Sequence, residues 1–565
     1  MSHRSEERST ANKTMARKML RSPSFIYRTK NYQAVLVMFD LVVKNGRVVD
    51  GTGSPWVRAD VGVKDGVIAE VGGNLKGEKT IDASGLVVSP GWIDIHMHAD
   101  HTILGNMRLE SYIHQGITTA TMGNCGLSMY PLHKHRDDLV AYLKPFTSGL
   151  KLGWDWNSME DFIKRAEAKG PGINLTPFVG HGSIRINAMG FDDRVPTDSE
   201  LGEMKSLLRE ALEQGAFGMS TGLGYPPGTF TQEEELIELG AILNVFGGLY
   251  STHMRGGVEN LGDTIRLGQR AGFPIQISHI GSSCASNPEL NNRHGEMTLR
   301  ALDEAREKGL DITADIYPYT AGSSLLSQVI PAWVQEGGVK KMLGRLRDPE
   351  TRERIKGEFS GEVGRKGRDL NKVFVTYVKS AANKCFEGTT IAEIAKARGV
   401  DGVDALCDLL IEEDAEAMNI TFWGEQGDVD TLVKHPAVMP CSDGWAHAPY
   451  GELGQGKPHP RCYGAFPRYL RTYVVEKRFF TLEEAVRRMT SMPAARLGLQ
   501  NRGIIKRGMA ADLTIFDPAN VKDTATFKDP HCYPEGIPYV MVNGRLAIEK
   551  GEHTGALAGK ILRKR

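Results

Sequence analysis

Cysteine is scarce in this sequence, with 7 residues in a chain of 565. The cysteines are odd in number and irregularly spaced, which argues against a disulfide framework and leads us to expect a reducing compartment, the cytoplasm. No run of about 20 apolar residues is present, so a membrane-spanning helix is not expected. Basic and acidic residues number 69 each. This balance indicates neither nucleic acid nor a membrane surface as a partner, and it leaves a homo-oligomer possible.

The first 37 residues are poor in acids and hold several arginines, among them Arg4, Arg8 and Arg17. They lack the apolar segment of a secretory signal peptide, so secretion is not expected. We interpret residues 1–37 as a basic, disordered leader. It is either a transit peptide or a stretch upstream of a natural start at Met38, and we favour the second interpretation.

The two ends of the remaining chain share a β-strand character. Alternating apolar runs flank the turn pair Asn45-Gly46, and a second such pair, Asn543-Gly544, follows Val540 to Val542. Asn-Gly between apolar runs predicts a hairpin in each case. We therefore predict one small β domain built from both termini, residues 38–92 and 498–565.

The middle of the chain alternates short apolar runs with helical stretches such as Asp198 to Gln214. This alternation predicts an α/β fold with a parallel barrel of the TIM type, here over residues 93–321 and 374–497. The rhythm breaks over residues 322–373, a charge-rich segment with helical patterns at Val339 to Arg347 and Pro349 to Phe359. We interpret 322–373 as an inserted helical segment that could act as a lid.

Potential metal ligands stand where the predicted strands end. In Gly91 to His98, the residues His96 and His98 lie two apart on a strand and so point to the same side. Other strand-like runs end in Cys125, His253, His279 and Asp443. Strand ends converge on the active site of an α/β barrel, and imidazole, thiolate and carboxylate groups together suit zinc. The pattern therefore predicts a metal-binding site at this end of the barrel.

The order His-x-His, Cys, His, His, Asp resembles that of the amidohydrolase superfamily. The cysteine in Gly123 to Gly126 makes the chain look like the D-aminoacylases, or N-acyl-D-amino-acid deacylases. The resemblance covers almost the whole chain from Met38, and further motifs carry it: Asp40 to Gly53, Ser89 to His98, Ser220 to Leu223 with Pro226 to Gly228, Thr252 to Arg255, Asp315 to Thr320, Ser442 to Gly444, His459 to Arg461 and Gly508 to Asp512. The fold of that family is a (β/α)8 barrel with a small β-sandwich from both termini.

The resemblance implies one or two zinc ions. Cys125, His253 and His279 would hold the main ion, and His96, His98 and Asp443 would form a second sub-site bridged by Cys125. Zinc lowers the pKa of a bound water toward 7. Asp443 would accept a proton from that water and deliver it to the leaving nitrogen, so that the amide bond of an N-acyl-D-amino acid is cut.

The resemblance also implies a clamp for the substrate carboxylate, made of an arginine, a tyrosine and a lysine. The arginine matches Arg461, and the tyrosine matches either Tyr317 or Tyr319. The lysine of the family lies two positions after the second histidine, where this chain has Gly281. This departure puts the substrate class in question.

Two other functions stay open. The chain could hydrolyse an amide without an α-carboxylate, as an amidase or as an enzyme of the hydantoinase or dihydroorotase kind. Against the cyclic substrates, no lysine stands at a comparable strand end between His98 and His253. The chain could also be a non-catalytic scaffold, but all six ligand positions are present.

Overall fold

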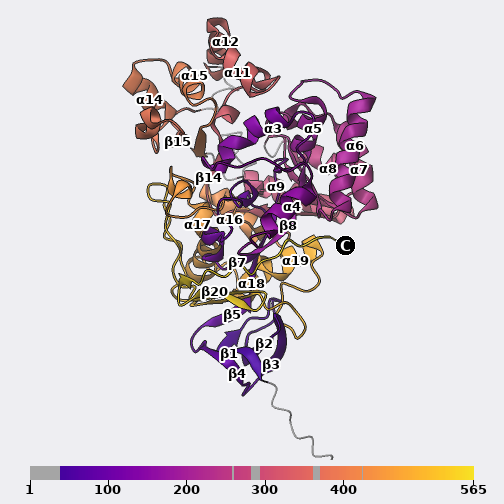
Figure 1. Cartoon of the computed structure of the whole chain (residues 1–565), viewed down its shortest axis with the longest axis vertical. Helices are drawn as coiled ribbons and strands as arrows, with labels where there is room; N and C mark the ends of the chain where they lie inside the picture. The colour runs from indigo at the N-terminus through magenta and orange to yellow at the C-terminus, as the bar shows by residue number, and fades with distance from the viewer. Residues whose placement is uncertain (1–37, 257–259, 282–292, 361–368, 423, 565) are drawn as a thin grey trace, which may run out of the picture. The chain divides into compact units, whose positions relative to one another are not determined.

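A computed structural model describes residues 38–256, 260–281, 293–360, 369–422 and 424–564. The predicted leader, 1–37, lies outside these residues. Figure 1 shows the arrangement of the described helices and strands. Most of the described chain packs around one large apolar core, and smaller cores lie in the segment after Ala321 and among the strands near the two ends. None of the described helices is both long and apolar enough to cross a membrane.

Two sheets of parallel strands, one of three strands and one of six, form the centre of the fold. Two of the nine, β8 and β9, are halves of one interrupted strand, which leaves the eight strands of a (β/α)8 barrel. They are β6 (Trp92–Asp94), β7 (Ile117–Met122), β8 (Asn174–Pro177) with β9 (Val179–Gly180), β10 (Gly218–Gly222), β11 (Leu249–His253), β12 (Ile275–Ile277), β13 (Ile312–Ile316) and β17 (Val438–Pro440). The last strand returns to the first through a hydrogen bond of 2.9 Å from the Asp443 amide to the His96 carbonyl. The predicted barrel is confirmed.

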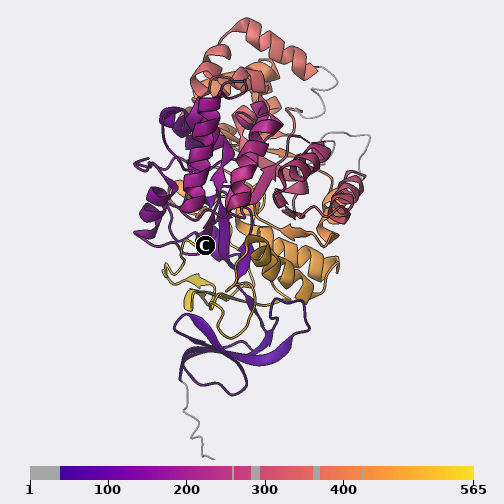
Figure 2. The ribbon, with the colours of Figure 1, turned by 90° about the vertical axis from the view of Figure 1, so that its right-hand side faces the viewer.

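Helices connect these strands and cover the barrel. Successive helices pack on one another in the order α5 (His181–Met189), α6 (Asp198–Glu213), α7 (Glu233–Val245), α8 (Leu261–Ala271) and α9 (His294–Glu307) (Figure 2). The predicted helix at Asp198 corresponds to α6. Thr197 caps its first turn by accepting a hydrogen bond from the Glu200 amide, and Met204, Leu207 and Leu208 bury one face. Capping box and apolar spacing together explain why this segment is helical.

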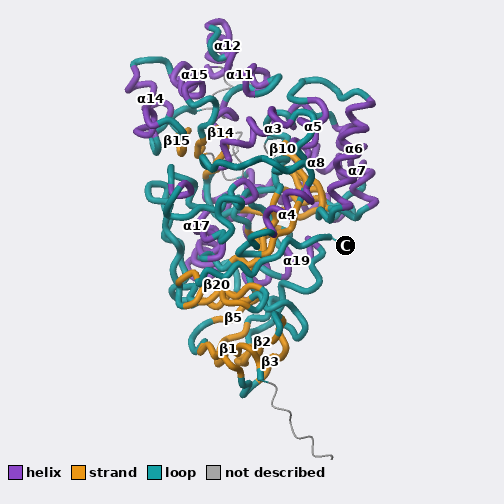
Figure 3. Tube along the Cα trace, in the orientation of Figure 1, coloured by secondary structure: helices purple, strands orange, loops and turns teal. Residues whose placement is uncertain are grey.

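The two ends of the chain meet in one sheet, as predicted. Strand β5 (Val87–Pro90) pairs with β18 (Leu513–Phe516), which joins the amino-terminal strands β1 (Phe39–Val48), β2 (Val57–Lys64), β3 (Val67–Gly72) and β4 (Gly77–Asp82) to the carboxy-terminal strands β19 (Tyr539–Val542), β20 (Arg545–Glu549) and β21 (Glu552–His553). Figure 3 shows these strands gathered in one region. These strands form one continuous sheet with an apolar core of its own, so the β domain expected from both termini is present.

The two predicted hairpins had different outcomes. Asn543-Gly544 forms a two-residue turn between β19 and β20, with Val542 opposite Arg545, so this prediction is confirmed. The prediction of a hairpin at Asn45-Gly46 is wrong. Strand β1 runs through both residues, and both of its halves pair with β2, with a bulge between Val43 and Gly46. Asn45 takes a left-handed φ of 61°, which a bulge uses as readily as a turn. The chain reverses after Val48, in the loop before Val57, and again at Asp65-Gly66 between β2 and β3.

A separate unit interrupts the barrel after β13. Its antiparallel sheet contains β14 (Ala321–Leu325), β16 (Met418–Phe422) and β15 (Val373–Tyr377), in that order. Helices α10 (Ala332–Gln335), α11 (Val339–Arg345), α12 (Pro349–Ser360), α14 (Ile391–Arg398) and α15 (Gly402–Glu412) pack with it around one of the smaller cores (Figure 1). The helices predicted at Val339 and Pro349 are α11 and α12. The sheet and its core continue to residue 422, well past residue 373.

Candidate metal centre and active site

All six predicted ligands lie at the carboxyl ends of barrel strands. His96 and His98 follow β6, Cys125 follows β7, and three more residues end or follow strands β11, β12 and β17: His253, His279 and Asp443. All are buried except His253, which is partly exposed. Active sites of (β/α)8 barrels are built at this end of the strands.

The six side chains form two groups that share one residue. His96, His98, Cys125 and Asp443 make one group, and Cys125, His253 and His279 make the other; within each, the potential ligand atoms lie within 4.8 Å of one another. The Cys125 Sγ lies 3.2 Å from His96 Nε2 and 3.4 Å from His279 Nε2. In the described chain, these groups are the only sets of three or more such residues that could hold a metal ion.

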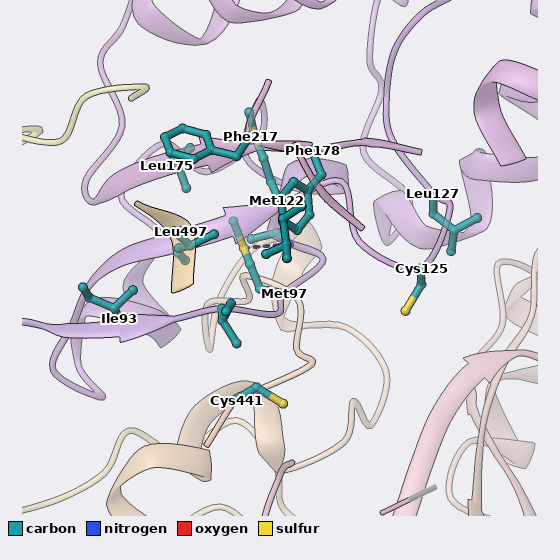
Figure 4. Packing of buried hydrophobic residues seen from close by; sticks show 14 of the residues in the cluster. Ile93, Met97, Met122, Cys125, Leu127, Leu175, Phe178, Phe217, Cys441 and Leu497 are labelled. Carbon is teal, nitrogen blue, oxygen red and sulfur yellow. Dashed lines mark hydrogen bonds between the residues drawn. The ribbon is translucent and has the colours of Figure 1, made fainter. Parts of the chain in front are cut away.

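The backbone is strained at three of these residues. Cys125, His279 and Asp443 have left-handed φ values of 56°, 33° and 50°. Such conformations cost energy in residues other than glycine, and they gather at functional sites. Gly123 permits the turn before Cys125, since an added Cβ would lie 2.3 Å from the Phe178 carbonyl oxygen. In Figure 4, Cys125 stands apart from the packed cluster that includes Met97, Met122 and Phe178. The loop thus presents the thiol to the site.

The electrostatics favour the metal-binding forms of Cys125, Asp443 and His253. Burial by itself would raise the pKa of the Cys125 thiol, but the imidazoles of His96 and His279 outweigh it and hold that pKa well below its ordinary value. Burial would likewise raise the pKa of Asp443, but the Arg461 guanidinium and His96 hold it well below the usual range. Burial lowers the pKa of His253, which keeps its imidazole neutral. A thiolate, a carboxylate and neutral imidazoles are the forms that bind metals. Burial would lower the pKa of His96 and of His98, but contacts with Cys125 and Asp443 outweigh it and raise the pKa of both, to about 9 for His98, so that metal binding there displaces a proton.

A cavity of about 400 Å³ opens beside the two groups. Its barrel side is lined by ligand residues and by Leu127, Phe146, Tyr225, Met254 and Trp445. Its other side comes from the inserted unit and includes Ser323, Ser324, Gln328, Val329 and Thr421. The volume suits a small-molecule substrate.

Arg461 lies at the same cavity and contacts Asp443. The Arg461 Nη1 is 2.8 Å from Asp443 Oδ2, and both side chains are buried. The guanidinium lies 4.6 Å from the centre of the Tyr317 ring. Tyr317 lines the cavity, whereas Tyr319 does not and packs edge-on against His459 and Phe527. Of the two tyrosines left open above, Tyr317 is therefore the one at the site. Gly281 does not line the cavity.

Two aromatic residues of the site carried no signal of their own in the sequence. Tyr225 donates a hydrogen bond of 2.7 Å to the Cys125 carbonyl and lies edge-on to His253. Trp445 stacks on His98 with ring centres 5.2 Å apart. A third residue, Asp315, opens the motif Asp315 to Thr320 and contacts His96 from behind, a role that the motif did not indicate. Tyr225 and Trp445 follow Gly222-Leu223-Gly224 and Asp443-Gly444, so proximity to a motif was the only available clue.

A (β/α)8 barrel that gathers histidine, cysteine and aspartate at its strand ends defines a metal-dependent hydrolase. Comparison with known proteins narrows this class. Residues 79–548 match the model of the amidohydrolase family. The D-aminoacylase of Alcaligenes xylosoxydans xylosoxydans is 33% identical over 531 residues, which is 93% of this chain and 97% of that protein. The N-acyl-D-aspartate deacylase of the same organism is 32% identical over 529 residues, 92% of this chain and 93% of that protein.

A solved structure is similar over the same extent. The N-acyl-D-glutamate deacylase of Bordetella bronchiseptica, complexed with zinc and a phosphonate inhibitor, superposes with a TM-score of 0.77. It is 31% identical, and the match covers 93% of this chain and all of that one. This chain belongs to the amidohydrolase family, and it is a hydrolase of carbon–nitrogen bonds other than peptide bonds.

Proposed function

We propose that this enzyme uses zinc to hydrolyse the amide bond of N-acyl-D-amino acids, releasing a carboxylic acid and a D-amino acid. The observation that carries the proposal is the pair of ligand groups that share Cys125 and meet Asp443 and Arg461 at one cavity. The similarity to deacylases of N-acyl-D-amino acids supports the substrate class.

The donor set and its spacing fit zinc. Two ligand atoms at about 2.0 to 2.3 Å from one tetrahedral ion are roughly 3.3 to 3.8 Å apart. The contacts from Cys125 to His96 and His279 measure 3.2 and 3.4 Å, and His253 Nδ1 lies 3.0 Å from His279 Nε2. An outward shift of a few tenths of an ångström would admit an ion. Cys125, His253 and His279 would hold the main ion, and His96, His98 and Asp443 would complete the second sub-site.

Asp443 would act as the general base and then as the general acid. When bound, zinc supplies Lewis-acid activation of water and of the amide carbonyl. Asp443 is ionised because its pKa is held low by Arg461 and His96 against the effect of burial. It accepts a proton as the water oxygen bonds to the amide carbon, and it passes that proton to the nitrogen as the carbon–nitrogen bond breaks.

Arg461 and Tyr317 would bind the α-carboxylate of the substrate. A guanidinium recognises a carboxylate through two parallel hydrogen bonds. Arg461 is held in place by Asp443 on one side and by the Tyr317 ring on the other. The cavity lining contains no lysine among the described residues, so this single arginine would take the place of the arginine–lysine pair of the family.

The deciding assay compares matched N-acetyl-D- and N-acetyl-L-amino acids, beside the same amides without the carboxylate, on zinc-loaded protein. We expect turnover of the D-acids only. If only the carboxylate-free amides are hydrolysed, the enzyme is still a zinc hydrolase, but its substrate is an amide without an α-carboxylate. Two observations favour that second candidate. Arg461 already neutralises Asp443, and Gly281 stands where the family has its lysine.

The domain division and location of the chain are also proposals. We infer a β-sandwich from both termini, a barrel, and an inserted unit that its sheet extends to residue 422. Limited proteolysis should cut between these parts first.

We infer a cytoplasmic location because the described cysteines are all free. Recovery of the enzyme in another cell fraction would contradict this location.

A further inference from the structure

One buried carboxylate, that of Asp315, lies behind the metal cluster and touches both of its ligand groups. Asp315 is on β13, and its side chain is fully buried. Its Oδ1 lies 3.2 Å from His96 Nδ1 and accepts a hydrogen bond of 2.7 Å from the His279 backbone amide. Its Oδ2 accepts a hydrogen bond of 2.8 Å from the Gln276 side chain.

The contact with His96 directs the other nitrogen of this ring into the cluster. With Nδ1 facing Asp315, Nε2 faces Cys125 Sγ at 3.2 Å and Asp443 Oδ1 at 3.4 Å. A carboxylate behind a metal-binding histidine holds the proton on the outer nitrogen, fixes the ring orientation and leaves the inner lone pair for the ion. The neighbouring ligand His98 has a different support, the stacked ring of Trp445.

The contact with His279 acts on the backbone. His279 has a φ of 33°, a strained conformation that persists only where neighbouring groups hold it. The hydrogen bond from its amide to Asp315 is short, at 2.7 Å. In this conformation the ring nitrogen Nε2 lies 3.4 Å from Cys125 Sγ and 3.0 Å from His253 Nδ1. Asp315 thus supports a ligand of the second group as well.

We propose that Asp315 is a positioning residue shared by the two metal sub-sites, so that removing its charge weakens zinc binding at both. The proposal rests on the zinc-dependent function proposed above. An asparagine at this position has one acceptor oxygen, whereas Asp315 meets His96 and the His279 amide through one oxygen and Gln276 through the other. The Gln276 oxygen is already used by Thr313 at 2.6 Å. Asp315→Asn therefore removes the negative charge that faces both ligands, and it preserves the hydrogen bonds only if Gln276 turns its amide and donates to the Thr313 hydroxyl.

The test measures zinc affinity directly, by titrating metal-free protein with zinc against a competing chromogenic chelator. The variant is Asp315→Asn, and the matched control is Glu235→Gln. Glu235 is another buried carboxylate, 2.7 Å from the Nε2 of a buried histidine, His181, and it touches none of the candidate ligands. The stability of the metal-free forms is measured in parallel by urea unfolding.

We expect Asp315→Asn to weaken zinc binding by about 10- to 100-fold in each resolved binding step, as losses behind metal-bound histidines do elsewhere. Glu235→Gln should bind zinc as the wild type does, even where its metal-free form unfolds more easily. Zinc affinity of Asp315→Asn within threefold of the wild type would overturn the proposal, as would an equal loss in Glu235→Gln. A loss confined to one binding step would overturn the shared role.

The result is independent of the substrate. A wild type that binds zinc but cleaves no N-acyl-D-amino acid would overturn the proposed function and leave the zinc titration to decide the role of Asp315. A wild type that binds no zinc would overturn both.

Discussion

Replacing Asp443 by asparagine tests the chemistry and the packing of the site together. The substitution keeps the shape of the side chain and removes its charge. Asp443 makes two contacts in the structure. Its Oδ1 lies 3.1 Å from His98 Nε2 in one ligand group, and its Oδ2 pairs with Arg461 Nη1 at 2.8 Å. Loss of the charge should therefore affect turnover and stability separately.

The expected magnitudes follow from these contacts. A positioned general base contributes about 10²- to 10⁴-fold in rate, so kcat should fall by that factor. At about 1.36 kcal/mol for each tenfold change, this corresponds to roughly 3 to 5 kcal/mol in the activation barrier. Arg461 is 1% exposed and would lose its partner. Breaking a buried ion pair from one side costs about 3 to 5 kcal/mol in the free energy of unfolding.

The assay combines kcat on the preferred N-acetyl amino acid, metal analysis of the purified protein and urea unfolding. Cys125, His253 and His279 form a group without Asp443, so the variant should keep at least one zinc ion per chain. Glu235→Gln removes a comparably buried charge that pairs with His181 and Arg185, and it should lose stability while keeping kcat. A kcat of Asp443→Asn within tenfold of the wild type, at normal zinc content, would refute the assignment of the base.

Four further predictions follow from the same structure. Dialysis against a chelator should abolish turnover, and added zinc should restore it; activity that survives in metal-free protein would contradict the metal assignment. Cys125→Ser should lose zinc from both sub-sites, because Cys125 is the residue common to both groups; metal analysis showing full occupancy would count against a shared ligand. Arg461→Lys should raise KM for N-acetyl-D-amino acids by at least tenfold and affect carboxylate-free amides much less, since lysine lacks the planar fork; equal losses on both substrates would place Arg461 in support of Asp443 alone. Thr197→Ala should lower the free energy of unfolding by about 1 kcal/mol, because the α6 cap is lost; an unchanged urea midpoint would contradict this.

The sequence was informative wherever the determining interactions are local. Strand and helix periods predicted the barrel, since apolar spacing alone decides which face of each element can be buried. The six ligand-type residues could be recognised because each ends or follows a strand, and the ends of barrel strands converge whatever the loops do. The hairpin at Asn543-Gly544 was predicted for the same reason, as its turn residues and flanking strands adjoin one another.

The Asn45-Gly46 error shows the limit of that approach. A left-handed asparagine followed by glycine suits both a turn and a bulge, and the local sequence does not distinguish them. What decided the outcome was strand β2, whose residues pair with both halves of β1. The extent of the inserted unit was hidden in a similar way, because β16 joins β14 and β15 across a long stretch of helices.

Sequence by itself thus determined the barrel, the metal-binding chemistry and the strand ends at which the ligands would be found. Only the tertiary structure decided which side chains meet at the site. It pairs Arg461 with Asp443, places Tyr317 and not Tyr319 at the cavity, and brings Asp315 into contact with both ligand groups. The physical reason is that closure of the barrel sets these contacts. Asp315 meets His96 across more than two hundred residues of chain, and no local pattern of side chains encodes a distance of that kind.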